Sequence, residues 1–323
     1  MALPTYASPL ERVWHWTYIA LCVAIFVFLI APIIVVIPLS FNAEPYFTFT
    51  EKMLSFDPDG YSMRWYDTLL TFGMSRADAP RDASWWADAW HNAKWVNAAK
   101  NSLIVGFFST ILATVLGTLA ALGLSRPEMP FRRIIMAILI SPMIVPIIIT
   151  ATGIFFFYSS ACVNTGSGLG RLLAPMLSNS GCLANTYLGV ILAHATLGIP
   201  FVIITVTATL IGFDQSLNRA AASLGANPRR TFFRITMPLI LPGVISGALF
   251  AFVTSFDEVV AVLFIAGPDQ QTIPRQMWNG IREQISPAIL SVATLLVIFS
   301  IALLATVEVL RRRSERLRGL SPA

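Results

Sequence analysis

Two adjacent carboxylates lie in the middle of an apolar run. Asp257 and Glu258 fall within residues 251–266, AFVTSFDEVVAVLFIA, which contain no Lys or Arg. A charge near the centre of a bilayer costs about 2.5–3.5 kcal/mol on insertion scales, so such residues usually face a polar interior. Consecutive helical residues point about 100° apart, so at most one acid faces straight into a central path. Asp257 is the first candidate for a lining that attracts a cation, and Glu258 is the second.

Neighbouring side chains fit the same chemistry. Thr254 lies three residues before Asp257 and would share its helix face, while Phe256, like Phe252, offers an aromatic surface to an ammonium group. A structural interpretation stays open for both acids, since either can pair with a neighbouring helix or cap a break in its own helix.

The composition places these residues in a membrane. Hydrophobic residues make up 56% of the 323 residues and charged residues 12%, with a mean hydropathy of +0.70. Soluble domains carry about 25% charged residues. We therefore expect a single all-α integral membrane domain over 1–323. A helix needs about 20 mostly apolar residues to span a bilayer. Segments of that length lie at 16–39, 102–124, 134–158, 185–211, 239–266 and 288–310.

Basic residues predict the orientation of these six spans. The connections on the side of both termini hold 13 Lys or Arg against four acids, including the basic tail 311–323, whereas the other side holds nine against ten. Because basic loops stay in the cytoplasm, we expect both termini there. The first span, with Arg12 before it, is too long for a removable signal peptide and lacks a small-residue cleavage site.

Cysteines and histidines predict no catalytic or metal site. Cys162 and Cys182 flank a non-cytoplasmic loop, where oxidising conditions favour a disulfide over two free thiols, and both interpretations stay open. No nucleotide-binding, metalloprotease or nucleophile-elbow motif occurs, and no second metal ligand accompanies any histidine. His194, within the fourth span, is expected to form a hydrogen bond between packed helices. The basic tail reflects membrane topology, so we expect no nucleic-acid partner.

One segment outside the membrane carries aromatic candidates. The stretch DGYSMRWYDTLL predicts a turn and a short amphipathic helix lying at the membrane interface. Its Trp65 and Tyr66 either touch an incoming solute or a binding protein, or simply anchor the helix at the interface.

The cytoplasmic connection 212–238 reads GFDQSLNRAAASLGANPRRTFFRITMP. Asp214 or Ser216 can cap a first short helix that ends near Gly225, and a second short helix is expected to end at Pro238. Two such helices at a right-angle turn would form a docking element.

This segment resembles the cytoplasmic loop of bacterial ABC importer permeases. The family pattern is E-A-A, three residues, Gly, nine residues, then I-x-L-P. The chain matches at Ala220, Ala221, Gly225, Ile235 and Pro238, and departs from the pattern at Arg219 and Met237. In that family the loop forms a coupling helix seated in a groove of a cytoplasmic ATPase. Arg219 in place of Glu reverses a charge at the helix start, so the groove of the partner is expected to differ there.

The resemblance also implies the other subunits of an importer. It predicts two ATP-binding cassette subunits, which would bind ATP and Mg because this chain has no nucleotide site of its own. A second homologous permease and a periplasmic substrate-binding protein would complete an importer in the bacterial inner (cytoplasmic) membrane, surrounded by lipid. This chain would catalyse no covalent step and would need no cofactor or metal.

The resemblance is closest to permeases of the spermidine/putrescine type. The stretches that carry it are YSMRWYDTLL, AAKNSLIVG, SFDEVV and TIPRQMWNGIREQISP. We therefore expect the chain to form half of a path for a cationic solute, most simply putrescine or spermidine. The same importer with an amino-acid derivative, an opine or Fe³⁺ as solute is the main alternative. An ion-coupled secondary carrier and a non-transport membrane scaffold or enzyme are the remaining alternatives.

Overall fold

The computed structural model describes residues 8–126, 128–160, 162–163, 176–178, 181–214, 216–283 and 286–317. Within these ranges the secondary structure is helical apart from an isolated bridge between Asn42 and Tyr61. The predicted all-α fold class is therefore confirmed. The chain divides into two compact units, Met1–Phe72 with Gly280–Ala323, and Gly73–Asn279.

The first unit is built on two long helices. It contains α1 (Pro9–Leu39), α2 (Glu51–Leu54), η1 (Pro58–Gly60), α3 (Arg64–Thr71) and α15 (Ala288–Leu317). Helix α1 begins with a capping box, in which the Ser8 hydroxyl accepts from the N–H of Glu11 and the Glu11 carboxylate accepts from the N–H of Ser8. It exposes almost all of its apolar side chains, as a helix in contact with lipid would. Its C-terminal end meets α15, where the hydroxyl of Ser291 donates to the carbonyl of Ser40.

The second unit holds the remaining elements. They are α4 (Ala83–Asn92), α5 (Lys94–Leu124), α6 (Arg132–Ile144), α7 (Ile147–Ser160), α9 (Tyr187–Ile211), α10 (Ser216–Ser223), α11 (Pro228–Thr231), the π-helical turn η3 (Phe232–Thr236), α12 (Met237–Asp257), α13 (Val260–Ile265), η4 (Pro268–Gln270) and α14 (Ile273–Glu283), which crosses into the first unit.

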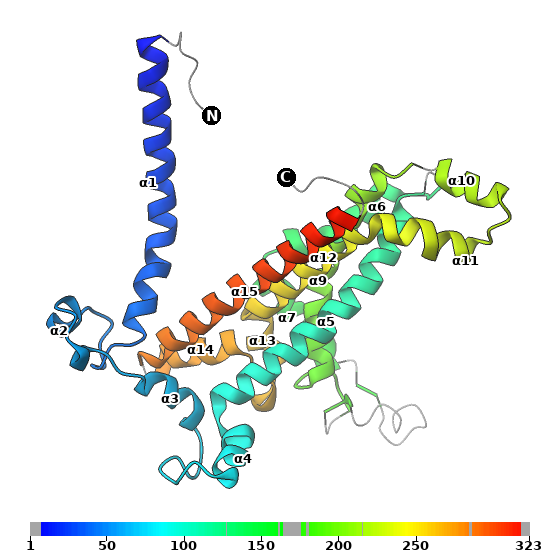
Figure 1. Cartoon of the computed structure of the whole chain (residues 1–323). Coiled ribbons are helices and arrows are strands. Elements are labelled where there is room, and N and C mark those ends of the chain that lie inside the picture. The colour runs from blue at the N-terminus through cyan, green and yellow to red at the C-terminus, as the bar shows by residue number, and fades with distance from the viewer. Residues whose placement is uncertain are drawn as a thin grey trace. The chain divides into compact units, whose positions relative to one another are not determined.

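Three helices, α5, α9 and α12, form the centre of this unit (Figure 1). Small residues let them approach closely, as is usual where helices pack within a membrane. A Cβ added to Gly117 of α5 would lie 2.7 Å from Val202 Cβ, and one added to Gly247 of α12 would lie 2.8 Å from the Cα of the same valine. The two glycines therefore set the spacing of all three helices around α9.

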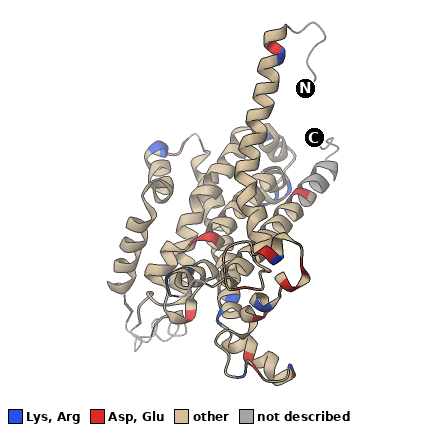
Figure 2. Cartoon of the chain, turned by 90° about the vertical axis from the view of Figure 1, so that its left-hand side faces the viewer, with Lys and Arg blue, Asp and Glu red and all other residues tan. Residues whose placement is uncertain are grey.

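Among the described residues, five helices are long and apolar enough to cross a membrane, and the bent pair α6–α7 makes a sixth if it counts as one span. Charged side chains lie mainly in the connections and near helix ends, and the long helices are tan over most of their length (Figure 2). This distribution is what burial in hydrocarbon requires.

Two of the predicted spans are interrupted. The segment 134–158 consists of α6 and α7, which meet at an angle of 103°. The segment 239–266 is divided into α12 and α13, with an extended backbone at Glu258. The second interruption falls at the two acids, where a break in the helix was one of the structural interpretations.

Candidate functional site

Helix α12 ends at Asp257. The Asp257 side chain is exposed, and no hydrogen bond or ion pair joins its carboxylate to any described residue. Within the described chain, the carbonyls of the last turn of α12 accept no backbone hydrogen bond from beyond the helix. A helix C-terminus carries a partial negative charge, so the Asp257 carboxylate adds to an already negative end. This end of α12 is suited to attract a cation.

The Glu258 side chain, unlike that of Asp257, forms a hydrogen bond within the chain. Its Oε1 accepts a hydrogen bond from the N–H of Ala261 at 3.0 Å, in the first turn of α13, and its side chain is half-buried. A side-chain oxygen at a helix start satisfies an N–H that has no partner within the helix. The two adjacent acids thus separate: Glu258 caps the second half-helix, as one of the structural interpretations anticipated, and Asp257 is left for an external partner.

The side chains next to Asp257 are only partly accessible to a cation. Thr254 and Phe256 are both half-buried. The Phe256 ring stacks on Phe252 with centroids 5.6 Å apart. Phe252 in turn lies against Gly106 of α5, where an added Cβ would come within 3.1 Å of its ring. One face of Phe256 is therefore occupied by another ring, which limits what it can offer a cation.

A buried polar cluster lies beneath this end of α12. His194 Nδ1 of α9 is 2.8 Å from Ser255 Oγ of α12, and the hydroxyl of Ser109 on α5 donates to the same Ser255 oxygen at 2.9 Å. His194 and Ser109 are each 1% exposed. The expected packing hydrogen bond of His194 is thus present, but the sequence analysis did not identify either serine, because a serine within an apolar run has no pattern of its own.

The far end of α13 is held by an arginine that the sequence analysis missed. Arg275 of α14 donates through Nη1 to the carbonyls of Val262, Ala266 and Gly267 at 3.1, 2.7 and 3.4 Å. Burial lowers the pKa of this guanidinium. A cation at a helix C-terminus also interacts favourably with the helix dipole. Arg275 therefore fixes the half-helix that follows the two acids.

Further polar contacts hold the loop after α13. The Asn101 amide on α5 donates to the carbonyls of Asp269 and Gln271 at 2.8 and 2.9 Å. The Tyr187 hydroxyl on α9 donates to Asn101 Oδ1 at 2.7 Å. The backbone N–H of Ile273 donates to the hydroxyl of Ser102. The loop is thus tied to both α5 and α9.

Trp65 and Tyr66 belong to the first unit and hold its parts together. Trp65 Nε1 donates to the carbonyl of Asn42 at 2.8 Å, and the Tyr66 hydroxyl is 2.8 Å from the hydroxyl of Ser40. The guanidinium of Arg64 also covers the Trp65 ring, 4.2 Å from its centroid. Both aromatic residues are half-buried and fasten α3 to the end of α1, so their polar atoms bind within the unit.

The segment with the family pattern forms a capped helix. Gly225 has φ of +79° and ends α10 in a Schellman motif: its N–H donates to the carbonyl of Ala222, and the N–H of Ala226 donates to that of Ala221. At the other end, the Asp214 carboxylate accepts from the hydroxyl and the N–H of Ser216, and these bonds lower the Asp214 pKa.

The surface of this segment is partly apolar and partly basic. Leu224 is 88% and Phe233 is 68% exposed, while Ala221 is buried against the rest of the unit. Arg219 and Ala220 are exposed on α10, and Ile235 and Met237 are half-buried. Large exposed apolar residues beside arginines are typical of a protein-binding surface.

The second short helix does not end at Pro238 as expected. Asn227 caps α11 through a hydrogen bond from the N–H of Arg230, and the helix then continues through η3 into α12. The N–H of Met237 donates to the carbonyl of Phe232, five residues back. A π-helical turn of this kind leaves carbonyls without an i+4 donor, so the missing N–H of Pro238 is tolerated. The second half of this segment, from Pro228, is therefore helically continuous with the span that ends at Asp257, whereas α10 is separated from it by the Gly225 turn.

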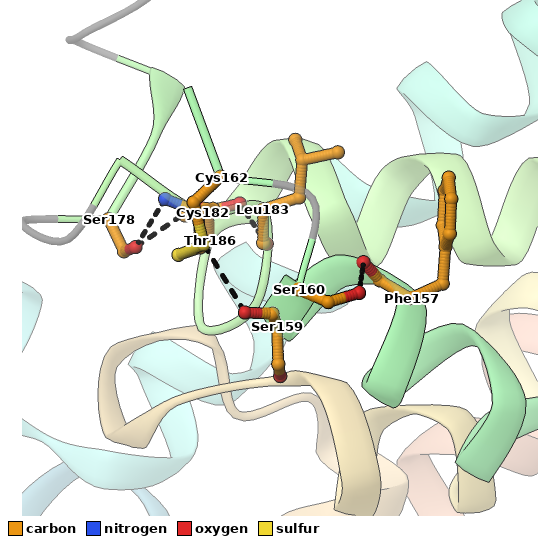
Figure 3. The surroundings of a disulfide bond; sticks show 8 residues. All are labelled: Phe157, Ser159, Ser160, Cys162, Ser178, Cys182, Leu183 and Thr186. Atoms are coloured by element: carbon orange, nitrogen blue, oxygen red, sulfur yellow. Dashed lines mark hydrogen bonds between the residues drawn. A yellow bond between two sulfur atoms is a disulfide. The ribbon is translucent and has the colours of Figure 1, made fainter. Parts of the chain in front are cut away.

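Cys162 and Cys182 form a disulfide with Cα atoms 4.1 Å apart (Figure 3). The bond lies between the end of α7 and the start of α9. Ser178 Oγ donates to the carbonyl of Cys182 and accepts from its N–H, at 2.9 and 3.1 Å. Most of the enclosed loop, residues 164–175 and 179–180, lies outside the described residues. Among those described, no cluster of His, Cys, Asp or Glu has the geometry of a metal site.

The helical units and their interrupted spans define a multi-pass membrane protein. Residues 113–317 match the family model of binding-protein-dependent transport system inner membrane components. Because this match covers more than half of the chain, the protein belongs to that family, and the predicted family is confirmed. It is thus a transport component of an inner membrane that works with a binding protein.

Curated relatives cover almost the whole chain. The spermidine/putrescine transport system permease protein PotC of Haemophilus influenzae is 25% identical over 90% of this chain and 95% of its own length. The putrescine transport system permease protein PotI of Escherichia coli K12 is 28% identical over 99% of this chain and 98% of its own.

Solved structures show the same fold. A bacterial ABC transporter that imports the acidic polysaccharide alginate has a chain that aligns with a TM-score of 0.61, covering 96% of this chain and 99% of that chain at 15% identity. The alginate transporter in complex with its pentasaccharide-bound periplasmic protein aligns with a TM-score of 0.64 over 94% and 96%. At this identity the likeness concerns the fold alone.

Proposed function

We propose that the chain is the permease subunit of an ATP-driven importer of polyamines. The names of the full-length relatives, which transport spermidine and putrescine, support this solute class. The observation that carries the proposal within the molecule is the exposed Asp257 carboxylate at the negative end of α12, which binds none of the described residues. A polyamine carries several ammonium groups on a flexible chain, and such a negative end can bind one of them.

The path would use the two acids differently. Asp257 would contact the passing ammonium, with Thr254 and Phe256 beside it, while Glu258 would keep α13 in place. Trp65 and Tyr66 would act as anchors of the first unit. An importer of this kind would be assembled from two such permeases, so the path would have a second half.

The segment 212–238 would contact the ATPase. The exposed Leu224 and Phe233 would fill an apolar groove in the ATP-binding subunit, and Arg219 would meet an acid at its edge. Two ATPase subunits would bind ATP and Mg, and a periplasmic binding protein would deliver the solute. Because the second half of this segment, from Pro228, continues helically into α12, a pull on it would be transmitted toward Asp257. Both termini would lie in the cytoplasm.

Isolation of the assembled complex tests the first part of this proposal. The tagged chain is purified from its native membrane in mild detergent, and we expect an ATPase and a second permease to accompany it. A chain that is isolated alone would contradict the coupling role of the segment 212–238 and favour an ion-coupled carrier.

Uptake by the reconstituted complex tests the solute and the acid. ATP-driven uptake of putrescine and spermidine is measured for the unsubstituted chain, Asp257→Asn and Glu258→Gln. We expect Asp257→Asn to slow uptake about tenfold, equivalent to about 1.4 kcal/mol of lost attraction, and Glu258→Gln to transport normally because glutamine still caps α13. Normal uptake by Asp257→Asn would remove this residue from the path. Uptake of an amino-acid derivative, an opine or Fe³⁺ instead of either polyamine would overturn the proposal that polyamines are the solute.

A further inference from the structure

The polar cluster of Ser109, His194 and Ser255 lies at the junction of two apolar clusters within the second unit. One apolar cluster contains α7, α13 and the first part of α9, with Ala151, Val190 and Val262 among its buried residues. The other contains later parts of α5 and α9 with α12, including Ala113, Val206 and Ile240.

Each member of the polar cluster lies close in sequence to buried residues of these apolar clusters, which interleave on α9, where Leu197 of the first follows Ala195 of the second. On α5, Ser109 falls between Val105 and Ala113. On α9, His194 lies between Ala193 of the first cluster and Ala195 of the second. Ser255 follows Ala251 of the second cluster and precedes the interruption at Glu258. The three side chains therefore form a single polar layer across three helices.

This layer holds the turn that carries Asp257. Ser255 is two residues before Asp257, and its hydroxyl oxygen contacts partners on two other helices at 2.8 and 2.9 Å. No backbone donor from beyond α12 binds the last carbonyls of that helix in the described chain, so backbone hydrogen bonds alone leave the turn free to fray. Side-chain contacts at Ser255 are what fix its rotation.

We propose that His194 is a positioning residue for Asp257. Through Ser255, and together with Ser109, it fixes the last turn of α12 so that the Asp257 carboxylate faces the water-filled path. His194 itself does not touch the solute. That this orientation of Asp257 matters for uptake rests on the proposed function. The orientation itself can be measured without a transport assay.

The contact between His194 and Ser255 can be removed by substitutions that still fill the space of the side chain. Such substitutions distinguish a positioning role of His194 from a packing role. Asparagine places an amide atom near the position of the histidine Nδ1, so His194→Asn can keep the contact with Ser255. Glutamine places its amide near Nε2, so His194→Gln fills the site but loses that contact. Ser255→Ala removes the shared oxygen. Thr207→Val is the matched control, because it removes another buried hydroxyl of α9 outside the cluster.

The experiment measures how fast a thiol at position 257 reacts with a cationic, water-soluble methanethiosulfonate. The chain carries Asp257→Cys with Cys22→Ser, the second change removing the one free cysteine of the described chain, and it is labelled as the complete importer in native membranes. A chain with Cys22→Ser alone supplies the background.

We expect His194→Gln and Ser255→Ala to slow labelling about fivefold, which is the factor that loss of one buried hydrogen bond gives in an equilibrium. His194→Asn and Thr207→Val should label at the parent rate. Equal rates in the parent, His194→Gln and Ser255→Ala would overturn the proposal. So would a parent thiol that does not react at all, since position 257 would then not face water. Should His194→Gln fail to assemble, Ser255→Ala, which loses one oxygen, decides the question.

The two proposals fail in distinguishable ways. If Asp257→Asn transports polyamines normally but the cluster variants still slow labelling, positioning stands and the path role of Asp257 is wrong. If Asp257→Asn stops uptake but labelling is insensitive to the cluster, the path role stands and His194 does not position it.

Discussion

The two interrupted spans of the second unit are broken in different ways. Between α6 and α7 the interruption is local: Val145 precedes Pro146 and adopts the extended backbone that a residue before proline prefers. The carbonyl of Ile138, which Pro142 leaves without an N–H donor, accepts from the hydroxyl of Ser141 at 2.7 Å. Every part of this interruption lies within a few residues of sequence.

Between α12 and α13 there is no proline or glycine. The sequence SFDEVV would permit a continuous helix, and the interruption depends on groups that hold the two half-helices apart: the Glu258 cap, Arg275 at the far end of α13, and the polar cluster at Ser255. An interruption maintained by side chains can be shifted by a ligand or a partner, whereas one imposed by proline cannot. This difference favours the second interruption as the functional one.

Arg275→Met should give the largest effect. It removes the side-chain donor to the Ala266 carbonyl, whereas the carbonyls of Val262 and Gly267 keep backbone donors. One unsatisfied buried acceptor costs about 1–3 kcal/mol. We expect a marked fall in the thermal unfolding midpoint of the purified protein. Arg282→Met on the same helix is the control, because Arg282 is exposed. Equal midpoints for the two variants would show that Arg275 does not maintain the interruption.

Removal of the Glu258 cap should have the next largest effect. Glu258→Ala loses the acceptor for the N–H of Ala261, which should lower stability by about 1 kcal/mol. Glu258→Gln keeps an oxygen in the same place and should unfold close to the unsubstituted protein in the same assay. If both substitutions behave alike, the charge of Glu258 matters and not its cap, and the division of roles between the two acids is wrong.

Pro146→Ala should have a smaller effect still. Its main consequence is a more flexible unfolded chain, worth about 0.4–1 kcal/mol. Pro130→Ala, in an exposed connection, supplies the same unfolded-state effect without a helix interruption. We expect both variants to unfold at similar temperatures. A much larger loss for Pro146→Ala would mean that the first interruption also depends on distant contacts.

The sequence predicted what depends on composition and on fixed spacing. The all-α class, the apolar segments and the family pattern around Ala220 and Gly225 follow from residues that lie close together in the chain. The Gly225 turn is an example, since its left-handed backbone suits glycine and both hydrogen bonds of the turn are local.

In the candidate site, the acid itself could be predicted, but the contacts around it could not, because they join residues far apart in the sequence. Asp257 could be identified because an acid in an apolar run is expensive, but the residues that hold the helix ends around it could not. Arg275 is 18 residues away in sequence and Ser109 contacts Ser255 across a separation of 146 residues. Pairings at such distances are decided by tertiary packing, which leaves no periodic signal in one sequence.

The smallest effect should come from the Asp257 charge itself, with the opposite sign from the other three. A carboxylate at a helix C-terminus is repelled by the helix dipole, so Asp257→Asn should stabilise the protein by about 0.3–1 kcal/mol while it impairs uptake. Asp214→Asn is the matched control at a helix N-terminus, where a negative charge is favourable and its loss should destabilise. The bonds from Ser216 lower the Asp214 pKa in the folded protein. Its contribution is therefore present above the unfolded pKa of about 3.9 and is lost as the pH falls through the folded value. Thermal unfolding at neutral pH should move the two midpoints in opposite directions. If Asp257→Asn also destabilises, its carboxylate has a structural partner, and the functional distinction between the two interruptions loses its electrostatic basis.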